Sequence, residues 1–281
     1  MKTILIPTDF SDNALLALKY AQAVYKCDRA CFFIVHAYGD EVYADHRADP
    51  STDLETIKWE RRKLSERKLD QLLDSVMGTP PNPLHNYEVV ATVESLVDGI
   101  NDLVNQMNID LVVMGTKGET SDHKSSFGSK TVEVFKYVNC PVLAVPANYR
   151  AGSPKNILFP TDFMVPYKRR ELKLLDDLGR EFKSNIHCLY ITDFEDLSPR
   201  QLDNKKFLEE TLGRSYLTVD TAPVKNRAQT ILEHIESQKA DLLVMVNSRH
   251  SFVEDMLYRS TVDLLALKLD IPFLVMQNLV R

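Results

Sequence analysis

The sequence lacks the features that mark membrane, secreted and nucleic-acid-binding proteins. No apolar stretch of its 281 residues approaches the roughly 20 residues that cross a bilayer. Residues 1–7 also lack the long apolar segment of a signal peptide, so we expect a cytoplasmic protein without membrane contact. Acidic residues outnumber basic ones by 40 to 34, and the net charge of −6 argues against a broad electrostatic grip on nucleic acid.

Cysteine is scarce as well. None of the four cysteines forms a C-x-x-C pair, which argues against a paired metal or redox motif. Two of them fall in apolar segments that we expect to be core strands, so the thiols should be reduced and mostly buried. The four are Cys27, Cys31, Cys140 and Cys188. We expect no metal site.

The chain contains two copies of one pattern. Residues 2–10, KTILIPTDF, return as residues 155–163, KNILFPTDF, with seven of nine positions identical and Pro7 and Pro160 lying 153 residues apart. Two later segments, DLVVM and CPVLAV, return as DLLVM and IPFLVM at a spacing of 131 residues. A repeat this long is a whole domain rather than a solenoid unit.

The boundary between the copies is a proline-bounded polar stretch at residues 146–154, which is typical of a linker. We predict a first domain over residues 1–148 and a second over residues 153–281. The chain length also favours two domains.

Each copy alternates apolar strands with helices. The strands expected in the first copy are 4–7, 31–37, 87–91, 109–114 and 141–145. Its helices are expected after an N-cap at Ser11, over 53–77, over 93–107 and from Gly128-Ser129 onward. The strands expected in the second copy are 157–160, 185–191, 215–219, 240–246 and 272–276. Continuous apolar strands separated by helices predict an α/β fold with two tandem, doubly wound, five-stranded parallel sheets of Rossmann-like type.

A glycine-rich loop follows the fourth strand of the first copy. Gly115 ends that strand, Gly118 comes three residues later, and Gly128-Ser129 opens the next helix. Glycine lets the main chain turn and approach a ligand, and the free N–H groups at a helix start form an anion site. The pattern favours phosphate binding, although a loop that serves only the turn can have the same spacing. In a doubly wound sheet this loop and Asp9 should meet at the strand ends.

These residues resemble the universal stress protein family in its tandem, two-domain form. The resemblance covers essentially the whole chain and rests on ILIPTDFS near the N-terminus, VHA at 35–37, the spacing Gly115-x2-Gly118-x9-Gly128-Ser129 and the strand CPVLAV. It implies a five-stranded doubly wound sandwich of the adenine nucleotide alpha hydrolase-like type. Members of the family with an intact glycine loop bind ATP, whereas members that lack the loop bind no nucleotide.

The resemblance implies an adenine nucleotide site in the first copy. Pro7, Thr8 and Asp9 would line the adenosine side, and Ala37 would offer main-chain contacts to the adenine. Ribose and phosphates would be surrounded by the glycine loop and the helix after it. That set comprises Met114, Gly115, Thr116, Gly118, Gly128, Ser129 and Lys130. Mg²⁺ is expected to accompany a bound triphosphate without a dedicated protein ligand.

Two residues of this set have plainer interpretations. Asp9 is also suited to capping the helix that follows it. Lys130 can also be an ordinary lysine on a solvated helix face, and the same holds for its neighbours Lys117 and Lys124 as solvent-exposed lysines.

All three loop glycines are replaced in the second copy. Counting the same spacing from its fourth strand places Asn247, His250, Ser260 and Thr261 at the positions of the glycines and of the serine after them. We expect the larger side chains to fill the space that a phosphate would need. The hypothesis is a degenerate domain that binds no nucleotide and serves structure or protein contact.

Three functions are compatible with the sequence: an ATP-binding regulator, a slow ATP hydrolase and a nucleotide-free protein scaffold. A hydrolase needs a group that activates water and positive charge on the transferred phosphoryl. Neither a G-x-x-x-x-G-K-[ST] loop nor a paired acid for magnesium lies near the motif. We therefore predict a regulator and not an enzyme.

Partner contacts are predicted at the last strand of each copy, which is apolar and at a sheet edge. The resemblance implies that the two copies pair through these strands about a pseudo-twofold axis within the chain. A homodimer of tandem chains and an unidentified protein partner stay open.

Overall fold

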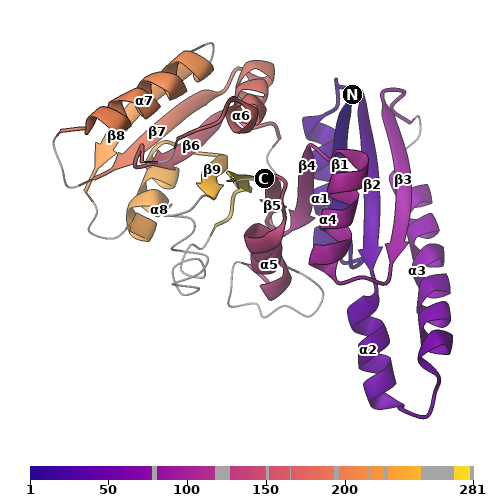
Figure 1. The fold of residues 1–281 in the computed structure, drawn as a ribbon. Helices are drawn as coiled ribbons and strands as arrows, with labels where there is room; N and C mark the ends of the chain where they lie inside the picture. Colours follow the sequence, from indigo (N-terminus) through magenta and orange to yellow (C-terminus); the bar gives the residue numbers. More distant parts are fainter. Residues whose placement is uncertain are drawn as a thin grey trace. The chain divides into compact units, whose positions relative to one another are not determined.

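The computed structural model describes residues 1–77, 81–117, 127–149, 152–164, 166–192, 196–213, 216–223, 227–247 and 269–278. The chain divides into two compact units, one of residues 1–122 and 128–147, the other of residues 123–127 and 148–281. Each unit combines parallel strands with helices (Figure 1). Among the described residues, no helix has the length and apolar character needed to cross a membrane.

The first unit contains a five-stranded parallel sheet of order β3-β2-β1-β4-β5. Its strands are β1 (Lys2–Pro7), β2 (Ala30–Ala37), β3 (His85–Thr92), β4 (Leu111–Gly115) and β5 (Val142–Val145). Its helices are α1 (Asp12–Val24), α2 (Gly39–Ala48), α3 (Leu54–Val76), α4 (Leu96–Met107) and α5 (Ser129–Tyr137). The order reverses between β1 and β4. Because crossovers between parallel strands are right-handed, α1 and α3 cover one face of the sheet, and α4 and α5 cover the other (Figure 1).

The second unit repeats this sheet in the order β10-β9-β6-β7-β8. Its strands are β6 (Asn156–Thr161), β7 (Asn185–Ile191), β8 (Tyr216–Ala222), β9 (Leu242–Asn247) and β10 (Phe273–Gln277). Its described helices are α6 (Arg169–Phe182), α7 (Pro199–Leu212) and α8 (Arg227–Ser237). The predicted α/β class with doubly wound parallel sheets is confirmed.

The strands form because they can be buried on both faces. Every residue of β2 except Ala37 is buried, as are all residues of β4 and β5. Such strands are continuous apolar runs in the sequence, which is why their positions could be predicted. Three of the four cysteines, Cys31, Cys140 and Cys188, are buried in these cores.

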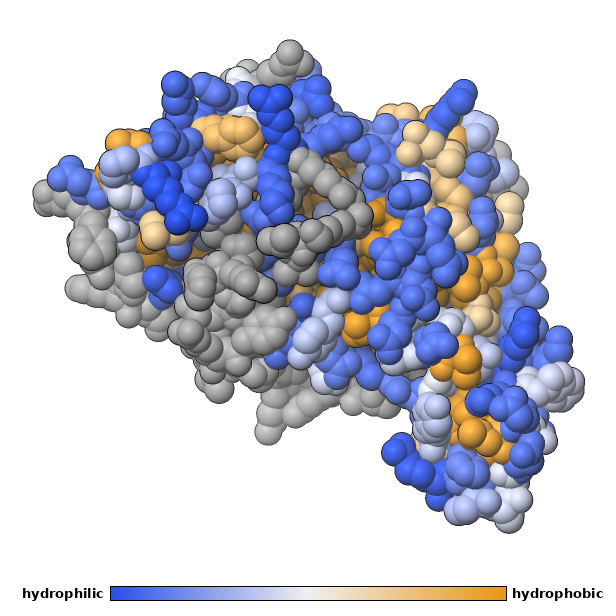
Figure 2. Space-filling view, in the orientation of Figure 1, coloured by the Kyte–Doolittle hydropathy of each residue, from blue (hydrophilic) through white to orange (hydrophobic). Residues whose placement is uncertain are grey.

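The main differences from the prediction in the first unit are helix α2 and the start of helix α4. Helix α2 was not predicted; Tyr38 and Val42 pack with Ile57 of α3 in a small separate core. Figure 2 shows mainly hydrophilic side chains on the outside of this α2–α3 hairpin, with hydrophobic ones between its helices. Helix α4 begins at Leu96 rather than at residue 93, because the Ser95 hydroxyl accepts the Asp98 N–H at 3.2 Å and caps the helix there.

The repeated PTDF sequence forms the same turn after β1 and after β6. Phe10 and Phe163 have φ angles of 66° and 55°, in the left-handed region that bulky residues rarely adopt. The preceding threonine holds each turn, since its hydroxyl accepts the phenylalanine N–H at 3.0 Å in both units. The motif therefore recurs for a structural reason that both units share.

Candidate functional site

A cavity of about 350 Å³ lies at the carboxyl ends of β1, β2 and β4. The sheet order reverses there, which is the position at which doubly wound sheets bind ligands. The volume is within the usual range for small-molecule sites. All described residues that line the cavity belong to the first unit.

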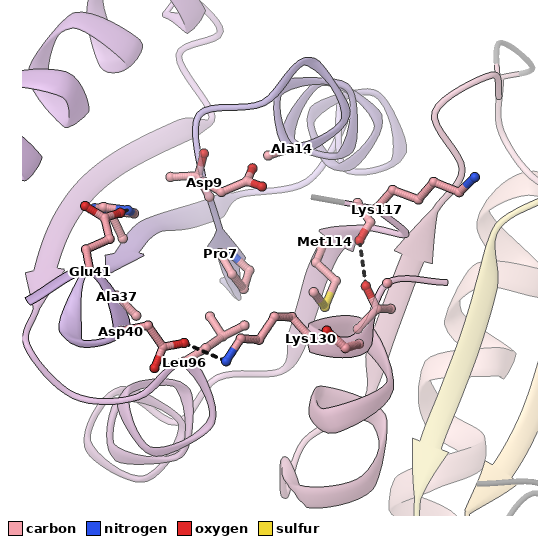
Figure 3. Close-up of a pocket in the computed structure, with 16 residues that line it drawn as sticks. Pro7, Asp9, Ala14, Ala37, Asp40, Glu41, Leu96, Met114, Lys117 and Lys130 are labelled. Atoms are coloured by element: carbon pink, nitrogen blue, oxygen red, sulfur yellow. Dashed lines mark hydrogen bonds and ion pairs between the residues drawn. The ribbon is translucent and has the colours of Figure 1, made fainter. Parts of the chain in front are cut away.

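Nine of the eleven residues predicted for the site line this cavity (Figure 3). They come from the ends of β1, β2 and β4 and from the start of α5, and they are Pro7, Thr8, Asp9, Ala37, Met114, Gly115, Gly128, Ser129 and Lys130. Thr116 does not line the cavity, and Gly118 lies outside the described residues. The structure thus brings together four segments that are far apart in the sequence.

Thr116 and Thr131 hold the start of α5 against the end of β4. The Thr116 carbonyl accepts the Gly128 N–H at 2.7 Å, and the Thr116 N–H donates to the Val145 carbonyl at 3.1 Å. The buried Thr131 hydroxyl lies within 3.2 Å of the Gly115 and Thr116 carbonyls. Sequence reasoning missed Thr131, because its position in the helix reveals nothing about a bond to the preceding strand.

The start of α5 lacks the side-chain cap that three other helices of the first unit have; α2, whose N-cap residue is Tyr38, lacks one as well but has acids in its first turn. Helices α1, α3 and α4 begin with Ser11, Asp53 and Ser95, whose side chains each accept an N–H from the first turn. The N-cap residue of α5 is Gly128, which has no side chain to offer, and the first turn of α5 contains no acid. Among the described residues, no side chain caps the N–H groups of this helix start, which together with the positive end of the dipole suit an anionic ligand.

Asp9 is exposed and lines the cavity, but it also serves the turn after β1. Its Oδ1 accepts the Ser11 N–H at 3.1 Å, and Ser11 rather than Asp9 is the N-cap of α1. The structural and the ligand-facing interpretations of Asp9 are thus compatible.

Gly115 is glycine because Asn13 packs against it. A Cβ at Gly115 would lie 2.7 Å from Asn13 Cγ and 3.1 Å from the Asn13 main-chain carbon. The buried Asn13 side chain donates to the Val145 carbonyl at 2.9 Å and accepts the Lys117 N–H at 3.0 Å. Packing against Asn13 is therefore a second reason for this glycine, beside the expected close approach of a ligand. No local pattern reveals this contact, since Asn13 lies 132 and 104 residues along the chain from Val145 and Lys117.

Charged residues from α2 and α5 face each other in the cavity (Figure 3). Lys130 Nζ lies 2.6 Å from Asp40 Oδ2, and this contact raises the pKa of Lys130. Glu41 and Lys117 also line the cavity. The sequence prediction did not include Asp40 and Glu41, because they lie in the first turn of helix α2, which was not predicted.

His36 closes the cavity beside Phe10. Its Nδ1 lies 2.8 Å from Ser65 Oγ and its Nε2 lies 3.2 Å from Glu41 Oε1. Burial lowers the pKa of His36, which favours the neutral ring. Glu41 also accepts a hydrogen bond from Arg61 at 2.9 Å. His36 is therefore a hydrogen-bonded wall residue that links the cavity to α2 and α3.

The strand register corrects one assignment in the second unit. Gly115 pairs with Val145, and Val246 pairs with Met276, the residue that repeats Val145. The counterpart of Gly115 is therefore Val246. Asn247, the residue predicted for that position, follows Val246 by one residue. The positions predicted for the other two glycines and the serine lie outside the described residues.

Larger side chains occupy the second unit at the positions that line the cavity of the first. Val246 stands at the position of Gly115, and Tyr190 and Ile191 stand at the positions of His36 and Ala37 in the sheet register. All three are buried. Tyr190 packs on Phe163 at 5.1 Å between ring centroids, just as His36 packs on Phe10.

Comparisons with known proteins agree with this geometry. The model of the universal stress protein family matches residues 1–146. A universal stress protein of Methanocaldococcus jannaschii is 28% identical over 154 residues, which are 51% of this chain and 81% of that protein. A universal stress protein of Thermus aquaticus is 29% identical over 144 residues, which are 51% of this chain and 98% of that protein.

The likeness in fold extends over both units. The crystal structure of a universal stress protein from Archaeoglobus fulgidus matches 98% of this chain and 96% of its own, with a TM-score of 0.69 and 16% identity. Since the family model matches more than half of the sequence, the chain belongs to the universal stress protein family.

Proposed function

We propose that the protein is an ATP-binding regulator of the stress response that holds the nucleotide in its first unit. The observation that carries this proposal is the cavity in which the Pro7–Asp9 turn, Ala37 and the uncapped start of α5 meet. Membership of the universal stress protein family supports an adenine nucleotide as the ligand.

Two parts of the cavity lining suit the two ends of a nucleotide. Pro7 and Ala37, at the ends of β1 and β2, offer an apolar lining for the base. Gly128, Ser129 and Lys130, at the start of α5, offer main-chain N–H groups and positive charge, which stabilise oxyanions. In this arrangement Asp9 lies next to the ribose, and Mg²⁺ travels with the phosphates.

The second unit is proposed to bind no nucleotide and to serve contact between domains or with a partner protein. Buried Val246, Tyr190 and Ile191 stand where the first unit has Gly115, His36 and Ala37. Asn247 is buried too, and its amide donates to Gln277 Oε1 at 2.8 Å. These residues support a filled second site.

Titration with ATP tests the function. We expect saturable binding of one ATP per chain in a calorimeter, with no multiple-turnover release of phosphate in a parallel assay. Continued phosphate release would instead establish the slow hydrolase, and absence of binding would establish the nucleotide-free scaffold. Two ATP per chain would contradict the proposed role of the second unit.

Replacing Ala37 by the residue found at the same register in the second unit tests the adenosine end of the site. Ala37→Ile introduces the residue that β7 carries at the same register, Ile191, which is buried there without disturbing the sheet. Filling the cavity with a larger side chain costs about 1 to 3 kcal/mol, so we expect ATP affinity to fall about tenfold. The binding isotherm of Ala37→Ser, which adds one atom, serves as the control. Unchanged affinity in Ala37→Ile would mean that the base lies elsewhere.

A further inference from the structure

An ion pair crosses the cavity between two helices that start at its rim. Lys130, in the first turn of α5, reaches Asp40, in the first turn of α2, at 2.6 Å, and both residues line the cavity (Figure 3). Glu133, one turn further along α5, lies 3.5 Å from the same Nζ but does not line the cavity. The ammonium group therefore has a carboxylate partner inside the site.

The helix dipoles stabilise one of these two charges and oppose the other. A carboxylate in a first turn is stabilised by the helix dipole, whereas a lysine in a first turn is opposed by it. Asp40 suits the start of α2, and Lys130 does not suit the start of α5. An anion next to Lys130 relieves this opposition, and Asp40 supplies one within the chain. A phosphate oxygen would supply another, because both oxyanions pair with ammonium groups.

We propose that Asp40 competes with ligand phosphates for Lys130 and thereby limits the affinity of the cavity for phosphorylated ligands. This inference rests on the proposed function and adds to it a residue that sets affinity and ligand choice. Binding of a phosphorylated ligand exchanges one ion pair, Asp40–Lys130, for another between Lys130 and the phosphate. A nucleoside without phosphate leaves the internal pair intact.

The exposure of the pair makes this exchange feasible. The side chains of Lys130 and Asp40 are 49% and 63% exposed, and exposed ion pairs contribute little to stability. A phosphate with more than one negative charge can therefore displace the single carboxylate. The same exposure means that substitutions at either position should leave the fold intact.

The test is a double-mutant cycle read out with ligands of different phosphate content. Calorimetric titrations of the parent, Asp40→Asn, Lys130→Gln and the double variant use ATP, AMP and adenosine. We expect Asp40→Asn to raise ATP affinity about twofold to fivefold and to leave adenosine affinity unchanged. In the Lys130→Gln background the gain should shrink, because the residue for which Asp40 competes has been removed.

Glu41→Gln is the matched control, because it removes the same charge from the next residue of the same helix and the same cavity. Glu41 contacts His36 and Arg61, and no contact between it and Lys130 is seen among the described residues. Its effect on ATP binding should therefore be the same with and without Lys130.

The outcomes separate this inference from the proposed function. ATP binding with equal gains from Asp40→Asn in both backgrounds overturns the role of Asp40 alone, as does an equal gain for adenosine. A parent chain that binds neither ATP nor AMP overturns the proposed function and this inference with it.

Discussion

Replacing Ser129 by glutamate is expected to weaken ATP binding about 30-fold while leaving the protein folded. Ser129 is the first residue of α5 and lines the cavity. Two unit charges 4 Å apart near a protein surface repel by about 4 kcal/mol before salt screening. Half of that value, about 2 kcal/mol, corresponds to the stated loss of affinity. Fluorescence or calorimetric titration with ATP measures it.

The design separates charge from size and from unfolding. Glutamate in the first turn of a helix is favoured by the helix dipole, so thermal unfolding of Ser129→Glu should match that of the parent. Ser129→Gln has nearly the same shape without the charge and should lose far less affinity. If Ser129→Glu and Ser129→Gln bind ATP equally well, the phosphates do not lie at the start of α5.

Replacing Gly115 by valine is expected to destabilise the first unit by about 3 kcal/mol. The new Cβ would overlap Asn13, whose side-chain and main-chain atoms would lie 2.7 to 3.1 Å away. Asn13 would have to move and give up its bonds to the Val145 carbonyl and the Lys117 N–H. Urea unfolding, monitored by circular dichroism and by the fluorescence of Trp59, measures the change. Trp59 is the one tryptophan of the chain and lies in the first unit.

Two further variants identify the cause of this loss. Gly152→Val is the control, because no described atom lies within 4 Å of a Cβ built there. Combining Gly115→Val with Asn13→Ala should cost less than the sum of the two single changes, since both act on one contact. Additive losses, or a Gly115→Val protein as stable as the parent, would contradict the packing explanation of this glycine.

The second unit has a different local sequence at the place that corresponds to Gly115 and Asn13. Val246 stands at the position of Gly115, the residue 153 positions after Asn13 is Pro166, and helix α6 begins only at Arg169. The two units thus show alternative solutions at the end of the same strand.

Local signals account for the parts of the fold and site that could be predicted from the sequence. Buried parallel strands such as β2 are unbroken apolar runs, and α3 begins after Asp53, a residue typical of helix starts. The doubly wound order then predicts that the ends of β1 and β4 meet, which places Asp9 near the start of α5.

The rest depends on contacts between segments that are distant in the sequence. Helix α2 is stabilised by packing on α3 rather than by its own pattern, so Asp40 could not be placed beside Lys130. The roles of Asn13 and Thr131 follow from bonds to the ends of β4 and β5. The misplacement of Asn247 has a different origin: the 131-residue spacing of the repeat already places Val246 at the position of Gly115, and the strand register agrees with that spacing.

The left-handed phenylalanines after β1 and β6 bear on how other chains of this kind should be interpreted. Since the same threonine bond holds both turns, a Pro-Thr-Asp-Phe sequence records how the polypeptide leaves its first strand and says nothing about what is bound beyond it. Survival of Asp162 is therefore no sign of a second ligand. Motif searches built on those four letters would count copies of the architecture, and the residue that ends the fourth strand would be the better guide to which copies have kept an open site.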